Sequence, residues 1–166
     1  MTNLLFKNKK SNAILDTITV LIVIVVFGMI SIFGWKIWDD LEADTREAIT
    51  DPDANESLNV INDRYPETLD GLFIFVLVGF WIIALIASYM IDAHPIFFGI
   101  SIFLLVFILV AVIHIGNFYE EIMADDDMTG MTDVFPMTNW VLSHMLITFI
   151  VIGTSIMLVL YAKLRS

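Results

Sequence analysis

The chain has 166 residues, of which 58% are hydrophobic and only 16% are charged. Soluble domains contain about 45–50% apolar and about 25% charged residues, so this composition excludes an ordinary soluble fold. The chain has no cysteine, which excludes disulfides, a thiolate nucleophile and cysteine-ligated metal. Its net charge of −11 argues against a basic surface, so we expect no nucleic-acid partner. The composition predicts an integral membrane protein in contact with the lipid bilayer.

Four apolar segments are long enough to cross a bilayer as helices, which needs about 20 residues each. They are residues 14–35, 71–91, 95–119 and 140–161. All four are too long and too uniformly apolar for the alternating strands of a membrane barrel. We therefore predict an all-α membrane protein with a single domain, residues 1–166. Its four transmembrane helices form an antiparallel bundle, and two outer loops, 36–70 and 120–139, form an acidic cap.

Polar residues and prolines mark the expected ends of these helices. Thr68 or Asp70 can cap the second helix, and Thr138 or Asn139 can cap the fourth. Residues 92–94 form a tight turn, after which Pro95 suits the first position of the third helix. Small residues that permit close helix approach lie inside the spans. They are Gly28, Ser31, Gly34, Ala84, Ser88 and Gly153.

The distribution of lysine and arginine predicts the orientation. Four spans place both termini on one side together with the 92–94 turn, and that side has five basic and two acidic residues. The other side, residues 36–70 and 120–139, has three basic and seventeen acidic residues. Because positively charged flanks stay inside, we expect both termini inside and both acidic loops outside.

The first outer loop begins with a helical pattern. Apolar or small residues recur at helical spacing and form one face of a helix that continues the first span. They are Trp35, Trp38, Leu41, Thr45 and Ala48. Asp51-Pro52-Asp53 then breaks the helix. The apolar residues of 54–67 either fold back on the Trp38/Leu41 stripe or leave it free to bind a partner; they are Leu58, Val60, Ile61 and Tyr65. Asn55-Glu56-Ser57 is a glycosylation sequon on the predicted outer side.

The second outer loop contains half of a calcium-binding pattern. Asp125, Asp127 and Thr129 have the spacing of the first ligands of a calcium loop, Gly130 permits its sharp turn, and Asp133 stands at the ninth position. The twelfth position is Pro136 instead of glutamate, so another carboxylate (Glu120, Glu121 or Asp126) would have to complete the site. The alternative is a solvated acidic turn, with the methionines of this loop serving as adaptable packing.

His114 and His144 are predicted near the outer ends of neighbouring antiparallel helices, and therefore at similar depth. Two facing histidines can hold a haem iron axially, or bind copper or zinc. The alternative is that each is neutral and hydrogen-bonded within the helices or lies at the interface. His94, in the 92–94 turn, is most simply interfacial.

Two short motifs carry a resemblance to a known class of proteins. They are the stretch Ile91-Asp92-Ala93-His94-Pro95-Ile96-Phe97-Phe98 and the stretch Gly116-Asn117-Phe118-Tyr119-Glu120-Glu121. With the apolar residues between them, over about residues 70–121, they resemble small multi-span membrane proteins of tailless icosahedral viruses with an internal membrane. The resemblance implies a structural role in a virion membrane, and it transfers no catalytic residue.

The sequence therefore predicts a non-enzymatic structural membrane protein. We expect it to act as one of many copies in a larger assembly, in contact with itself or with other membrane or capsid proteins. The alternative is a small membrane subunit of a redox or ion-translocating complex that uses His114 and His144 as ligands.

Overall fold

The computed structural model describes residues 13–90 and 95–165, and within these ranges every regular element is a helix. The elements are α1 (Ala13–Ala48), α2 (Pro52–Met90), α3 (Pro95–Met123), a 3₁₀ turn η1 (Asp126–Met128), α4 (Met131–Val134), α5 (Pro136–Ser143) and α6 (Met145–Arg165). The predicted all-α class is confirmed. The predicted turn at 92–94, with His94, lies outside the described residues.

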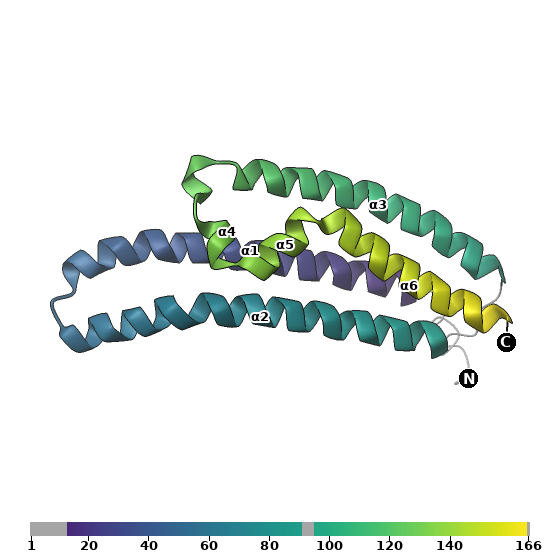
Figure 1. Ribbon diagram of the computed structural model, residues 1–166, viewed down its shortest axis with the longest axis horizontal. Helices are drawn as coiled ribbons and strands as arrows, with labels where there is room; N and C mark the ends of the chain where they lie inside the picture. The colour runs from purple at the N-terminus through teal and green to yellow at the C-terminus, as the bar shows by residue number, and fades with distance from the viewer. Residues whose placement is uncertain (1–12, 91–94, 166) are drawn as a thin grey trace, which may run out of the picture.

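Four helices, α1, α2, α3 and α6, are long and apolar enough to cross a membrane. They run antiparallel, so that the first turns of α1 and α3 lie at the same end of the bundle as the last turns of α2 and α6 (Figure 1). The protein is thus an integral membrane protein with several spans. The short elements η1, α4 and α5 lie toward the opposite end, between α3 and the α1–α2 pair.

The helices extend further than the predicted spans. The expected continuation of α1 to about residue 49 is confirmed, since α1 ends at Ala48. The prediction that the second helix begins near 71 is wrong, because α2 begins at Pro52 and passes through Pro66 without ending. Thr68 is therefore no cap: its hydroxyl donates to the backbone carbonyl of Arg64, one turn earlier in the same helix, at 2.7 Å.

The fourth apolar segment is two helices instead of the predicted single one, with the break at His144. The Ser143 hydroxyl donates to the carbonyls of Asn139 (2.8 Å) and Trp140 (3.2 Å), and the His144 ring also contacts the Trp140 carbonyl, at 2.9 Å. Side chains that bond to the preceding turn compete with the backbone ladder and bend helices. The predicted caps Thr138 and Asn139 are also wrong, because α5 begins two residues earlier, at Pro136.

Close helix contacts occur at most of the predicted small residues. A Cβ added to Gly28 would lie 2.6 Å from the Phe73 ring, and one added to Gly153 would lie 2.4 Å from Leu105. Gly34 is the exception, since an added Cβ would meet no atom within 4 Å. Ser31, Ala84 and Ser88 are all buried.

The transmembrane helices pack over only part of their surface. Large side chains such as Phe75, Phe103 and Phe107 are 69–75% exposed in the isolated chain. The Trp81 indole donates to the Ser155 hydroxyl at 2.8 Å, and this hydrogen bond between side chains joins α2 to α6. The bulky outward faces suit contact with lipid chains or with neighbouring proteins.

Candidate functional site

The ends of α1 and α2 form a helical hairpin, here called the outer hairpin (residues 36–70), that extends well past the end of α3 (Figure 1). With 36 and 39 residues, α1 and α2 are much longer than the hydrocarbon core requires. A helix rises about 1.5 Å per residue and the core is about 30 Å thick, so roughly a third or more of each helix lies beyond it. The outer hairpin is therefore the part of the chain that extends furthest from the other helices (Figure 1).

Polar and aromatic contacts join the two arms of the outer hairpin. The Trp38 indole donates to the amide oxygen of Asn62 at 3.0 Å, and at the base of the hairpin Trp35 stacks on Tyr65 with ring centroids 6.2 Å apart. Arg46 bonds to Glu42 on its own helix and donates to Asn59 on α2 at 2.7 Å. Residues 54–67 thus fold back on α1 as predicted, but Trp38 is met by the polar Asn62. The expected apolar contact is wrong, since Val60 and Ile61 are 52% and 39% exposed and Leu41 is 57% exposed.

Most of the charge on the outer hairpin is solvent-facing and negative. Of its eleven acidic residues, only Glu42 and Asp70 are buried, and nine are exposed. Three basic residues oppose them, and two of these, Lys36 and Arg46, already pair with Asp40 and Glu42 on the same helix. The hairpin therefore presents an acidic surface with little internal neutralisation.

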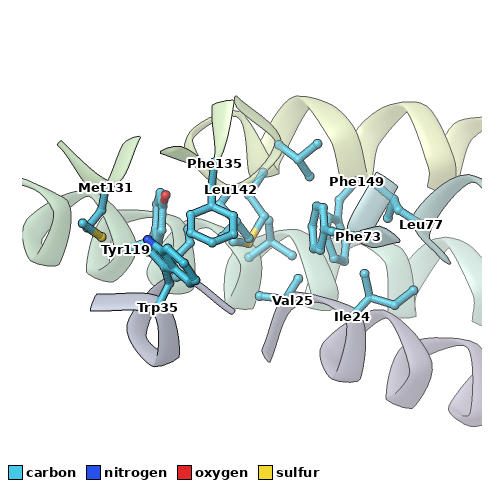
Figure 2. Packing of buried hydrophobic residues seen from close by; sticks show 14 of the residues in the cluster. Ile24, Val25, Trp35, Phe73, Leu77, Tyr119, Met131, Phe135, Leu142 and Phe149 are labelled. Carbon is cyan, nitrogen blue, oxygen red and sulfur yellow. The ribbon is translucent and has the colours of Figure 1, made fainter. Parts of the chain in front are cut away.

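The second outer connection has the opposite character. Here η1, α4 and α5, together called the short-helix segment (residues 126–143), bury most of their apolar residues between the long helices (Figure 2). Phe135 and Leu142 are fully buried, and Met128 and Met131 are 7% and 6% exposed. These two methionines pack as predicted, whereas Met137 remains 55% exposed.

A buried carboxylate fixes this segment to α2. Asp70 is 4% exposed, and its two oxygens accept hydrogen bonds from the backbone N–H groups of Met137 (3.0 Å) and Thr138 (2.7 Å). These are second and third residues of α5, whose own N-cap position is Phe135, without a side-chain acceptor. Asp70 thus caps a helix, but it is α5 instead of the predicted α2.

A second polar contact holds the same region. The Tyr119 hydroxyl, near the end of α3, donates to the amide oxygen of Asn139 on α5 at 2.9 Å, and Tyr119 is 1% exposed. Asp70 and Tyr119 therefore tie α5 to two different long helices. Both bonds orient a short helix that is too brief to be stable without tertiary contacts.

The predicted cation ligands lie on the exposed edge of this segment. Asp125 accepts the backbone N–H of Asp127 at 3.1 Å and so caps η1, while Asp127, Thr129 and Asp133 are exposed. Gly130 takes the left-handed φ of +90° expected of a sharp turn. Among the described residues, no group of three or more carboxylates or histidines is arranged to hold a metal ion. The calcium site remains a prediction from the spacing.

The two span histidines each bond to their own helix. His114 Nδ1 lies 2.8 Å from the Val110 carbonyl, and His144 Nδ1 lies 2.9 Å from the Trp140 carbonyl while its ring stacks on Trp140. Both side chains are exposed. No hydrogen bond or ring contact joins the two histidines within the described parts of the chain. A ring nitrogen held by a backbone carbonyl is also how metal-bound histidines are oriented, with Nε2 toward the metal.

Comparisons with protein-family models, with curated proteins and with solved structures gave no match for this chain.

Pro136 is a sequence signal for the hydrogen bonds between Asp70 and the start of α5, which the sequence analysis did not predict. Pro136 is a strong marker of the first helical turn, and it places Phe135, which has no side-chain oxygen, at the cap. The free N–H groups of that turn need an acceptor from elsewhere. Asp70, at the edge of an apolar segment, was a candidate acceptor, but only the packing of α2 against α5 identifies it.

Proposed function

We propose that this protein is a non-enzymatic structural component of a membrane, acting as one of many copies in a larger assembly. The observation that carries the proposal is the division of the molecule into lightly packed spans and a long acidic outer hairpin. In an 18-residue apolar stretch of each of the four long helices, only 11–33% of the residues are buried within the chain. Such spans are suited to lateral contacts with copies of the same protein or with other membrane or capsid proteins.

The sequence resemblance to membrane proteins of tailless icosahedral viruses supports one setting for this role, a virion membrane beneath a protein shell. In that setting the outer hairpin is the part that reaches the shell. The proposal requires no catalytic group.

Assembly can be tested by measuring the mass of the complex after mild detergent extraction, with cross-linking in the intact membrane as a second readout. We expect a complex of several chains. A monodisperse single chain by both readouts would contradict the proposal.

We further propose that both termini lie inside and that the outer hairpin and the short-helix segment lie outside. Since the chain has no native cysteine, single cysteines at Ser57 and Thr129 can be labelled selectively. Both positions are exposed. An impermeant thiol reagent added from outside should label Ser57→Cys and Thr129→Cys but not a cysteine added at either terminus. Labelling of the two positions from opposite sides would overturn the four-span topology.

A second candidate function is a small subunit of a redox or ion-translocating complex, with His114 and His144 as haem or metal ligands. The observation that favours it is that each Nδ1 is held by a backbone carbonyl. An absorption spectrum of the purified protein distinguishes the two functions. A haem Soret band that is lost in His114→Ala and His144→Ala, but kept in a variant at the exposed Tyr161, would favour the redox subunit over the structural role.

A further inference from the structure

One apolar stripe on α1 lies uncovered and continues from the membrane into the outer hairpin. It consists of Ile30, Gly34, Ile37 and Leu41, here called the α1 stripe, with successive spacings of four, three and four residues. Ile30, Ile37 and Leu41 are 62%, 61% and 57% exposed, and no atom lies within 4 Å of a Cβ built at Gly34. This spacing is that of a helix face that packs along a second helix.

The outer half of the α1 stripe lies beyond the end predicted for the first span, residues 14–35. Ile37 and Leu41 follow Trp35, the aromatic residue at the predicted end of the first span. Trp38, between them in sequence, is partly buried and bonds to Asn62 on α2. With the span ending at Trp35, the two aliphatic side chains face water beside the membrane surface unless another molecule packs on them.

The charges next to the stripe indicate what kind of molecule fits. Asp40 follows Ile37 by three residues, and Asp44 follows Leu41 by three, a spacing that places side chains side by side on a helix. Asp40 is paired with Lys36, but Asp44 and Glu47 make no ion pair within the described chain. A helix docked on Ile37 and Leu41 would meet uncompensated negative charge at its edge.

The same charges disfavour two other occupants. Copies of this protein in one membrane share an orientation, so two α1 stripes would pack in parallel and bring Asp44 against Asp44. Each outer hairpin has eleven acidic and three basic residues, so two hairpins would repel. Anionic lipid headgroups would be repelled in the same way.

We propose that the outer half of the α1 stripe docks a basic amphipathic helix of a different protein, at the membrane surface. Its apolar face covers Ile37 and Leu41, and its lysine or arginine flank faces Asp44 and Glu47. This inference rests on the proposed structural function and specifies the partner that the outer hairpin would hold.

The test uses the full chain in nanodiscs of zwitterionic lipid. The probe is a synthetic helical peptide with leucine at heptad a and d positions and lysine at the flanking positions. A scrambled peptide of the same composition, a glutamate-flanked analogue and empty nanodiscs serve as controls. We expect the lysine-flanked peptide to bind, and the scrambled and glutamate-flanked peptides to bind much more weakly.

Two pairs of matched variants locate the binding site. Ile37→Ser with Leu41→Ser should weaken peptide binding about tenfold or more, since two large apolar contacts are lost. Val60→Ser with Ile61→Ser, at 52% and 39% exposure on α2, should leave it nearly unchanged. Asp44→Asn with Glu47→Gln should weaken binding and flatten its salt dependence, whereas the exposed pair Glu120→Gln with Glu121→Gln should not.

Equal binding of the scrambled peptide, or equal loss in the α1 and α2 variant pairs, would overturn the inference. The inference would also be overturned if a photo-crosslinker at position 37 joined two copies of this chain and added peptide did not reduce the cross-linked product. If the peptide fails to bind while the extracted protein is still a multi-chain complex, the docking inference fails and the structural function stands.

Discussion

The outer hairpin and the short-helix segment are both acidic connections at the same end of the bundle, yet they fold in opposite ways. The hairpin continues two transmembrane helices outward and leaves Ile37, Leu41 and nine carboxylates exposed. The short-helix segment turns back between the long helices and buries Phe135, Leu142 and the backbone of Thr138. The difference shows that acidic composition does not decide where a loop goes.

Two physical features account for the difference. In the hairpin, the arms satisfy their backbone bonds within long helices and need only a few contacts such as Trp38 to Asn62 to stay paired. The short-helix segment cannot satisfy its own helix ends, so it depends on outside groups such as Asp70 and Tyr119. Substitutions should therefore affect stability far more in the short-helix segment than in the hairpin.

The largest contrast is expected between Phe135 and Leu41. Phe135→Ala removes a fully buried ring and should lower the free energy of unfolding by about 3–5 kcal/mol. Leu41→Ala, at 57% exposure, should change it by less than about 0.5 kcal/mol. Thermal or denaturant unfolding in detergent, followed by circular dichroism, measures both. Similar losses in the two variants would show that the hairpin is as tightly packed as the short-helix segment.

The Asp70 contact provides the next test. Asp70→Ala leaves the N–H groups of Met137 and Thr138 without their acceptor, which should cost about 1–3 kcal/mol. Glu67→Ala, one turn earlier on the same helix but exposed, is the control and should be nearly neutral. Hydrogen exchange should show faster exchange at Met137 and Thr138 in the Asp70 variant alone. Unchanged exchange there would mean that α5 does not need the carboxylate.

The two glycines of α1, Gly28 and Gly34, test how closely α1 packs against α2 and α5. Gly28→Ala places a methyl group 2.6 Å from the Phe73 ring and 3.2 Å from Thr138, and both of these side chains are fully buried. It should destabilise the protein by about 1–3 kcal/mol, because neither neighbour can move freely. Gly34→Ala meets open space, so it should be neutral or slightly stabilising through helix propensity. Equal melting temperatures for the two variants would contradict this packing.

A smaller effect is expected at Tyr119. Tyr119→Phe removes the hydroxyl that donates to Asn139 and should cost about 0.5–1.5 kcal/mol, with the ring contacts kept. Tyr65→Phe is the control in the hairpin, since Tyr65 is 55% exposed and uses its ring to stack on Trp35. If the Tyr65 variant loses more stability than the Tyr119 variant, the two regions differ less in stability than the burial of these two tyrosines indicates.

The smallest effect concerns cations at residues 125–133. Because Asp125 already caps η1 and its neighbours face solvent, we expect calcium, magnesium and sodium chloride of equal ionic strength to raise the melting temperature equally. A larger rise with calcium, lost in Asp125→Asn with Asp127→Asn, would instead establish the calcium site that the spacing predicts.

The sequence by itself determined the class of protein and the long helices. Uniform apolar segments of this length predict helices that can cross a membrane, and the recurrence of Trp35, Trp38 and Leu41 correctly extended the first of them. These features are local, because backbone bonds within a helix are made between residues four apart. Length and hydropathy are therefore enough to find them.

Only the tertiary structure decided which polar groups meet. Asp70 and Thr138 are 68 residues apart in the chain, and their hydrogen bond exists because α2 and α5 pack together. Leu41 and Trp38 share one helix, yet only Trp38 finds a partner across the hairpin. Caps and docking faces depend on which surface a neighbouring helix covers, and residue spacing within one helix does not contain that information.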